Sequence, residues 1–132
     1  MGDEQILVVE DNARNMTLVR DVLHATGYRT LEASTGRQAV LLAAQHGPAL
    51  VLMDIRLPDI DGTEALRLLR ADERTASIPV LAVTAEAMAG DRERLLAAGF
   101  DGYLSKPIDL DALLVAVRLH HPGASAIPGT NS

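Results

Sequence analysis

The sequence contains no cysteine, and this absence excludes two kinds of chemistry. Without cysteine the chain can form no disulfide framework, and it offers no thiolate to a metal ion or a substrate. Tryptophan is also absent, and there are one phenylalanine and two tyrosines, although 48% of the residues are hydrophobic. The interior must therefore be built from Leu, Val, Ile and Ala, with few large aromatic anchors.

Basic residues are in short supply as well, since 12 Lys and Arg stand against 18 Asp and Glu and give a net charge of −6. Affinity for nucleic acid comes from clustered Lys and Arg, so this balance argues against a nucleic-acid partner. Residues 1–9 lack the basic flank and long apolar stretch of a signal peptide. No apolar run approaches the roughly 18 residues that span a bilayer. We therefore expect a soluble, cytoplasmic protein without a membrane partner.

Short strand-like runs alternate along the chain with longer segments of helical periodicity. The expected strands are 5–9, 28–33, 49–53, 78–83 and 102–105, and the expected helices are 13–26, 35–46, 62–71, 87–98 and 109–121. Three of the strands are uninterrupted apolar runs, which is typical of a parallel sheet covered by helices on both faces. We expect one α/β domain over residues 1–121, followed by a disordered tail, rich in Gly, Pro and Ser, over 122–132.

Polar side chains collect where the expected strands end. In the stretch "ALVLMDIRLPDIDG", Asp54 directly follows an apolar run, and in an open α/β sheet ligands bind beyond the carboxyl ends of the strands. The residues that follow the other strands are Glu10, Asp11, Thr84 and Lys106. Each alone has a plainer explanation as a turn former, a helix cap or a solvated surface residue. Their occurrence after four different strands favours one shared site.

The chemistry of these side chains is coherent. Crowded carboxylates repel one another, so they take up a proton or bind a cation, and oxygen ligands favour Mg²⁺ or Mn²⁺. The Asp54 carboxylate can attack a phosphoryl group to give an acyl phosphate, while Lys106 and Thr84 stabilise its oxygens. Four further acids fit turn, cap or first-turn positions instead: Asp59, Asp61, Asp109 and Asp111.

From about Gln5 to His121 the sequence closely resembles the receiver domain of bacterial two-component response regulators. "VVEDN" carries the acidic pair of that family, "LMDIRLPDIDG" its phosphoacceptor loop, "AVTA" its hydroxyl position and "YLSKP" its lysine-proline. "VEDN" with "SKPID" is most similar to single-domain receivers and to those attached to hybrid kinases. The resemblance implies a flavodoxin-like, doubly wound fold with a five-stranded parallel sheet of order 2-1-3-4-5 and five helices.

The resemblance also implies a function in a phosphorelay. A histidine kinase or a histidine phosphotransfer protein would pass a phosphoryl group from its phosphohistidine to Asp54. Asp11 and Asp54 would bind Mg²⁺ through their side chains, Arg56 through its backbone carbonyl, and Glu10 through water. On this interpretation the chain is a phosphoacceptor that assists its own phosphorylation and dephosphorylation.

By the same resemblance, Thr84 and Lys106 contact the phosphoryl group, and the Lys106–Pro107 peptide is cis, against about 5% of such bonds in general. Tyr103 is the switch aromatic, whose ring turns into space that Thr84 vacates. The face formed by the fourth helix, the fifth strand and the fifth helix would then be remodelled for a downstream effector. An ordinary edge-strand role for Tyr103 remains the alternative.

Arg56 lies two residues after Asp54, and Glu86 lies two residues after Thr84. The two side chains can face each other across the mouth of the site and screen the acyl phosphate from water. The simpler alternative is an exposed ion pair worth under ~1 kcal/mol.

Three other functions were weighed. A phosphatase of the haloacid dehalogenase type needs a second Asp where this chain has Arg56, and it needs a cap domain. A flavin-binding module needs a phosphate loop rich in Ser, Thr and Gly after the first strand, where this chain has "EDNARN". A degenerate receiver, which binds partners without phosphorylation, stays open. We expect no output domain after the last helix, and on this expectation any of the receiver functions would act through a separate protein.

Overall fold

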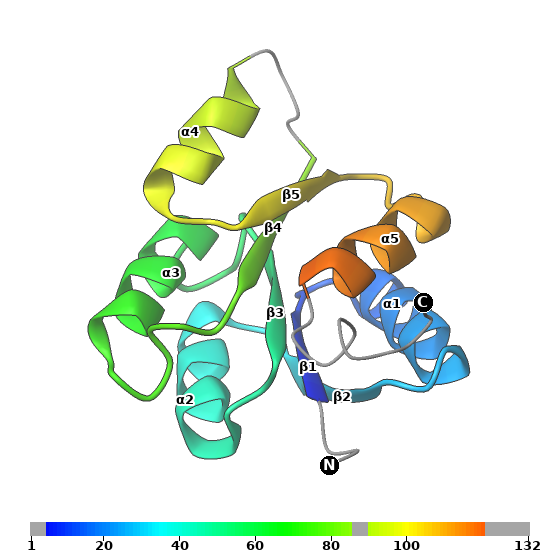
Figure 1. The fold of residues 1–132 in the computed structure, drawn as a ribbon, viewed down its shortest axis with the longest axis horizontal. Helices are drawn as coiled ribbons and strands as arrows, with labels where there is room; N and C mark the ends of the chain where they lie inside the picture. Colours follow the sequence, from blue (N-terminus) through cyan, green and yellow to red (C-terminus); the bar gives the residue numbers. More distant parts are fainter. Residues whose placement is uncertain (1–4, 86–89, 121–132) are drawn as a thin grey trace.

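The computed structural model describes residues 5–85 and 90–120, and within these ranges five strands alternate with five helices (Figure 1). The strands are β1 (Gln5–Val9), β2 (Arg29–Ala33), β3 (Leu50–Asp54), β4 (Val80–Thr84) and β5 (Gly102–Ser105). The helices are α1 (Ala13–Ala25), α2 (Gly36–His46), α3 (Gly62–Ala71), α4 (Asp91–Ala98) and α5 (Leu110–His120).

The strands form one parallel sheet of order β2-β1-β3-β4-β5. The expected flavodoxin-like fold is therefore confirmed, and β2, which was expected to be an edge strand, lies at one edge. The chain leaves β1 toward β2 on one side and reaches β3 on the other. This reversal between β1 and β3 places a crevice at their carboxyl ends, where such sheets bind ligands.

Helices cover both faces of the sheet, and each face has its own hydrophobic cluster (Figure 1). Alternate residues of a strand point to opposite faces, so Leu7 packs in the cluster under α2, α3 and α4, while Ile6 packs in the cluster under α1 and α5. All five residues of β3 and of β4 are buried, as expected for strands covered on both sides. Phe100 is the one aromatic residue among the buried core residues of the described chain, in agreement with the composition.

Helix starts follow the expected capping chemistry in most places. The Asp61 side chain accepts a hydrogen bond from Glu64 N at 3.0 Å, and the Asp109 side chain accepts one from Asp111 N at 2.9 Å. Both caps are thus confirmed. The helix expected over 87–98 is shorter, because Gly90, with a φ of 92°, is its N-cap and residues 87–89 lie outside the described part of the chain.

Two strand boundaries also differ from the expectation by one or two residues. The strand expected over 49–53 ends at Asp54, and the strand expected over 78–83 ends at Thr84. Asp54 is in register with Val83, so the ladder continues through the acid. Asp54 and Thr84 are therefore the last residues of their strands, and the sheet itself holds their backbones.

Arg70 of α3 links the segments at the end of the sheet where β4 and β5 begin, opposite to the carboxyl ends of the strands. Its guanidinium donates hydrogen bonds to three backbone carbonyls and one carboxylate: Ala76 O at 3.1 Å, Ile78 O at 2.7 Å, Gly99 O at 3.2 Å and Asp101 Oδ2 at 3.1 Å. Arg70 thereby joins α3 to the carboxyl end of α4 and to the start of β5. Among the helices described, none combines the length and the apolar character that crossing a membrane requires.

Candidate functional site

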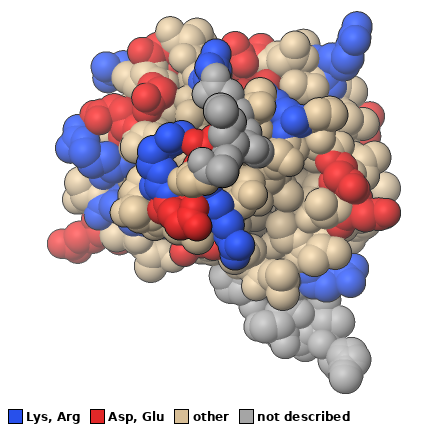
Figure 2. Space-filling model, turned by 90° about the horizontal axis from the view of Figure 1, so that it is seen from above, with Lys and Arg blue, Asp and Glu red and all other residues tan. Residues whose placement is uncertain are grey.

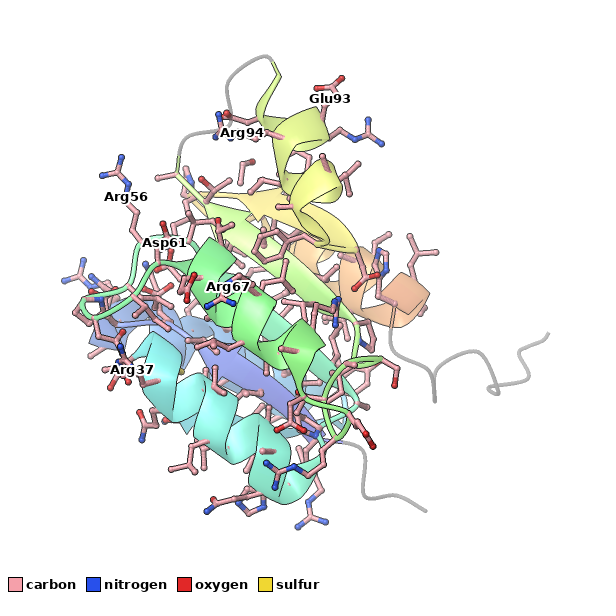
Figure 3. All side chains as sticks on the ribbon, turned by 90° about the vertical axis from the view of Figure 1, so that its left-hand side faces the viewer. Arg37, Arg56, Asp61, Arg67, Glu93 and Arg94 are labelled. Carbon is pink, nitrogen blue, oxygen red and sulfur yellow. The ribbon has the colours of Figure 1, made fainter. Side chains whose placement is uncertain are left out.

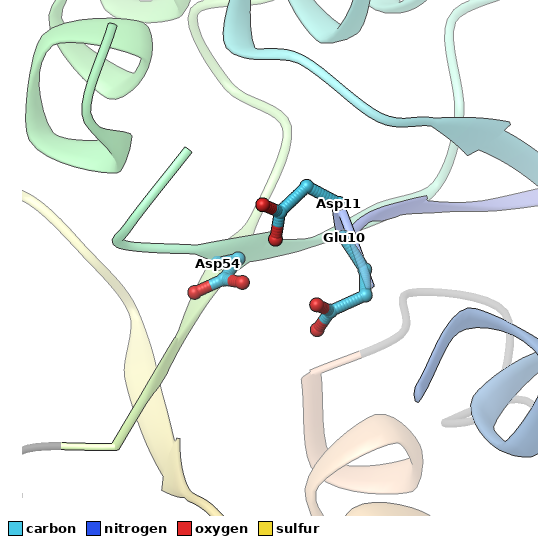
Figure 4. A group of neighbouring side chains, drawn as sticks. All are labelled: Glu10, Asp11 and Asp54. Carbon is cyan, nitrogen blue, oxygen red and sulfur yellow. The ribbon is translucent and has the colours of Figure 1, made fainter. Parts of the chain in front are cut away.

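Three carboxylates meet at the carboxyl ends of β1 and β3 (Figure 4). Glu10, Asp11 and Asp54 each offer an oxygen, and these oxygens lie within 4.8 Å of one another. Glu10 and Asp54 are 4% and 3% exposed, whereas Asp11 is exposed. The structure thus brings together the three acids singled out in the sequence, with two of them buried and the third facing solvent.

The backbone around these acids is tied into the sheet. Glu10 N donates to Ala33 O at 3.0 Å, which extends the pairing of β1 with β2 past the last residue of β1. The Glu10 carboxylate accepts a hydrogen bond from Asn12 N at 3.0 Å, and the Asp54 carboxylate accepts one from Arg56 N at 3.2 Å. Both buried carboxylates are therefore oriented by the loop that follows them.

Lys106 places an ammonium group between the two buried acids. Its Nζ lies 2.9 Å from Asp54 Oδ2 and 3.1 Å from Glu10 Oε1, and its side chain is 19% exposed. Lys106 N also donates to Thr84 O at 2.8 Å, which joins the loop after β5 to the end of β4. The Lys106–Pro107 peptide is cis, as expected.

Burial and the ion pair between Lys106 and Glu10 shift the pKa values of these two residues in opposite directions. Burial raises the pKa of Glu10, the nearby charge of Asp54 adds to this, and the Asn12 N–H and Lys106 oppose it. Burial alone would lower the pKa of Lys106, but its hydrogen bonds to Asp54 and Glu10 raise the pKa above the ordinary value. Lys106 therefore keeps its charge at neutral pH.

The cluster has the composition of a hard-cation site. Three carboxyl groups share one ammonium group, and this excess of acidic groups favours a cation. Carboxylate oxygens suit Mg²⁺, which keeps part of its water shell, and the exposed Asp11 gives access from solvent. The residues present therefore fit a magnesium ion that also binds a phosphate oxygen.

Thr84 and Tyr103 lie on neighbouring strands. Thr84, which is buried, is in register with Ser105, and Tyr103 is in register with Ala82. Tyr103 packs against the cluster under α2, α3 and α4, to which Ala82 also belongs, so strand alternation directs Thr84 to the same face as Tyr103. Tyr103 also lines a cavity of about 410 Å³ together with residues of α4 and α5.

Arg56 is exposed, and Figure 3 shows its side chain extending outward from the loop after β3. The suggested partner, Glu86, lies outside the described residues, so the pairing of the two stays a prediction. Acidic and basic side chains are interspersed over the face of the molecule seen in Figure 2.

The structure shows two features of the loop after β3 that the sequence did not predict. Asp59 was assigned to a turn, but its carboxylate also accepts hydrogen bonds from Gly36 N and Arg37 N at the start of α2. A Cβ on Gly62 would lie 2.6 Å from Asp54 O, so α3 begins directly against the backbone of Asp54. The close approach of Gly62 could have been found from the sequence pattern "DG" at 61–62. The hydrogen bonds of Asp59 to α2 join residues more than 20 positions apart, and no local pattern indicates them.

Comparisons with known proteins identify the family of this chain. The family model described as response regulator receiver domain matches residues 6–118. The polar-differentiation response regulator DivK of Brucella ovis is 44% identical over 115 residues, which cover 87% of this chain and 94% of the relative.

Solved structures show the same similarity. The receiver domain of the sensor histidine kinase PA1611 from Pseudomonas aeruginosa PAO1, with a magnesium ion coordinated in its active site cleft, is 40% identical, with a TM-score of 0.82 over 89% of this chain and 96% of that one. The chemotaxis protein CheY4 of Vibrio cholerae is 25% identical, with a TM-score of 0.82 over 89% of this chain and 98% of that one. The chain therefore belongs to the response regulator receiver domains of two-component signalling, as the resemblance implied.

Proposed function

We propose that this chain is a phosphorylation-dependent switch that accepts a phosphoryl group on Asp54. The observation that carries the proposal is the position of the Asp54 carboxylate, which lies within 4.8 Å of Glu10 and Asp11 and 2.9 Å from the Lys106 ammonium. A nucleophilic carboxylate, a cation site and a fixed positive charge are the parts that phosphoryl transfer requires.

In this reaction, an oxygen of Asp54 attacks the phosphorus of a partner's phosphohistidine. The new O–P bond forms as the P–N bond breaks, and the electron pair returns to the imidazole nitrogen. Lys106 shifts from the carboxylate toward a phosphoryl oxygen, and the Thr84 hydroxyl donates a hydrogen bond to another. The donor is a histidine kinase or a histidine phosphotransfer protein.

A divalent cation fits the acids of the site. Asp11 and Asp54 would hold Mg²⁺ through their side chains, Arg56 through its backbone carbonyl and Glu10 through water. Bound there, the cation supplies positive charge that offsets the charge of the phosphoryl oxygens. Mn²⁺ suits the same oxygen donors.

Phosphorylation then acts on a separate effector protein. Thr84 moves toward the phosphoryl group, and the ring of Tyr103 turns into the space left behind, which the shared face of β4 and β5 supports. The surface of α4, β5 and α5 changes as a result, and the altered surface is what the effector reads. We place this activity in a receiver domain of residues 1–121, acting in the cytoplasm, with 122–132 as a tail.

Phosphorylation with a small donor tests the proposal. The chain is incubated with Mg²⁺ and acetyl phosphate and then measured by intact mass. We expect one added phosphoryl group, sensitive to hydroxylamine as an acyl phosphate is, and no addition in Asp54→Asn. Asp61→Asn is the matched control, because Asp61 lies in the same loop but caps α3, and it should still be phosphorylated.

A failure of phosphorylation would support the competing function, a degenerate receiver. If no phosphoryl group is added from acetyl phosphate or from a phosphorylated histidine phosphotransfer protein, the chain is a degenerate receiver that binds its partners without phosphorylation.

A further inference from the structure

The loop between β3 and α3, residues 55–61, is fastened to the first turn of α2 by the side chain of Asp59. Its Oδ1 accepts a hydrogen bond from Gly36 N at 2.8 Å, and its Oδ2 accepts one from Arg37 N at 2.9 Å. The first N–H groups of a helix have no partner within the helix, and the helix dipole favours an anion there. Both oxygens of the carboxylate are thus engaged by α2, beside the labelled Arg37 in Figure 3.

A second contact between the same two segments depends on the lack of a side chain. A Cβ on Gly36 would lie 2.6 Å from Ile60 Cγ1 and 3.2 Å from Ile60 O. Gly36 is buried, and Ile60 packs against the hydrophobic cluster on this face of the sheet. The loop therefore lies directly on the start of α2, next to the hydrogen bonds of Asp59.

Hydrogen bonds to neighbouring elements also hold the start of this loop. Ile55 N donates to Val83 O at 3.0 Å, and Gly62 N donates to Ile55 O at 2.8 Å. The start of the loop is thus bound to β4 and to α3. Asp59 is the residue that binds its middle, between Arg56 and the cap of α3, to a different element.

This attachment links the two halves of the acidic cluster. Glu10 N is bound to Ala33 O, and the chain reaches Gly36 three residues after Ala33. The end of β2, just before α2, is thus bound to the residue that follows β1, and the start of α2 is bound to the loop after β3 through Asp59. Because the Arg56 N–H that orients the Asp54 carboxylate lies in the loop after β3, a displacement of this loop would change the position of that carboxylate relative to Asp11.

We propose that Asp59 is a positioning residue for the phosphoryl-transfer site. By tying the loop after β3 to α2, it holds the Arg56 carbonyl and the Asp54 carboxylate at the separation from Asp11 that binding of Mg²⁺ requires. The inference rests on the proposed function, and it assigns to α2 a part in the chemistry although α2 contributes no side chain to the cluster.

Thr35 offers a matched control. Its side chain accepts a hydrogen bond from Gln38 N at 3.1 Å and caps the same end of α2, and among the described residues it forms no hydrogen bond with the loop after β3. Asp59→Ala and Thr35→Ala each remove hydrogen bonds from the start of α2. Only Asp59→Ala also releases the loop.

The experiment compares the two variants with the unchanged chain in urea unfolding, in Mg²⁺ titration by calorimetry and in the Mg²⁺ dependence of phosphorylation by acetyl phosphate. We expect both variants to lose stability. Asp59→Ala should bind Mg²⁺ about tenfold more weakly, as is typical when an outer partner of a metal ligand is removed, and Thr35→Ala should bind it as before. Asp59→Asn keeps one acceptor oxygen and should fall between, and it replaces Asp59→Ala in the comparison if that variant does not fold.

Equal Mg²⁺ affinity in the Asp59 and Thr35 variants would overturn the inference and leave Asp59 as a helix cap. If the unchanged chain binds no Mg²⁺ and accepts no phosphoryl group, the proposed function itself fails, and the inference fails with it. Mg²⁺ binding and phosphorylation of the unchanged chain therefore distinguish a failure of the proposed function from a failure of the inference about Asp59.

Discussion

Lys106 and Asp54 form an ion pair with 2.9 Å between Nζ and Oδ2, at the carboxylate on which a phosphoryl group would be placed. The same ammonium group lies 3.1 Å from Glu10, so one charge holds two buried acids together. In the absence of a bound cation, Lys106 therefore supplies the positive charge of the cluster. A phosphoryl group on Asp54 would convert this carboxylate into an acyl phosphate, and the phosphoryl oxygens would then compete with Glu10 for the ammonium group.

Removing the ammonium group should destabilise the fold in a way that Mg²⁺ partly corrects. In Lys106→Met the buried acids lose their positive partner, and we expect a loss of roughly 1–2 kcal/mol in the free energy of unfolding, reduced by the access of solvent to the site. Urea unfolding with and without Mg²⁺ measures this loss. Lys106→Arg keeps the charge and should lose less; equal stability of Lys106→Met and the unchanged chain without Mg²⁺ would contradict the prediction.

Mg²⁺ should stabilise the unchanged chain but not Asp11→Asn. A ligand that binds the folded state at ten times its dissociation constant adds about 1.4 kcal/mol to the free energy of unfolding. Asp11 is exposed, so its replacement should change little in the absence of the cation. Thermal unfolding across a Mg²⁺ titration checks both statements, with Asp21→Asn on the exposed side of α1 as a control that should respond like the unchanged chain. An undiminished Mg²⁺ response in Asp11→Asn would contradict the metal site.

The ionisation of Asp59 should make part of the stability depend on pH. Burial raises the pKa of Asp59, but hydrogen bonds from backbone N–H groups, those of Arg37 and Gly36 first, outweigh it and lower the pKa from 3.8 to about 2. A lowered pKa in the folded state means that the carboxylate stabilises the fold above pH 3.8 and that this contribution is lost as the pH falls toward 2.

The measurement compares the unchanged chain with Asp59→Asn, which does not titrate, by chemical unfolding at a series of pH values. The difference in stability should be full at neutral pH and should narrow below about 3.8. The corresponding difference for Thr35→Ala should not vary with pH. A constant difference for Asp59→Asn would show that the charge does not contribute.

Arg70 should matter for stability and not for phosphorylation. Arg70→Ala leaves two partly buried carbonyls, those of Ala76 and Ile78, without this donor, and we expect a loss of roughly 2 kcal/mol in the free energy of unfolding. Arg70→Lys should recover little, because an ammonium group cannot reach four acceptors in the geometry of the guanidinium. Phosphorylation by acetyl phosphate should proceed at an unchanged rate below the unfolding temperature. Arg70 contacts the segments where β4 and β5 begin, whereas Asp54 lies at the carboxyl end of β3. A slower reaction in a fully folded Arg70→Ala would contradict this separation.

The fold and the acidic cluster could be predicted because their signals are local. Apolar runs identify the buried strands, and in a parallel sheet the residues at the strand ends share one edge, which brings Glu10 and Asp54 together. The strand ends were misplaced because the ladder continues through Asp54 and Thr84, whose polarity suggested that the strands had already ended.

Contacts between distant segments could not be predicted in the same way. The hydrogen bonds of Asp59 to α2 cross 22 and 23 residues, and Asp59 follows no strand end that would place it beside α2. Such pairs depend on how the loops pack after the sheet has formed. The start of α4 was misplaced for a different reason, because an Ala-rich segment carries no strong capping signal before Gly90.

The anchoring of Gly99 by Arg70 has a mechanical consequence for α4. The carboxyl end of this helix is tied to α3, whereas its amino end begins at Gly90 without a side-chain cap. A helix of 8 residues is about 12 Å long. A rotation of about 15° around its carboxyl end would move the amino end by roughly 3 Å and the carboxyl end hardly at all. A rotation of this kind would therefore change the direction of α4 while its attachment to α3 is kept.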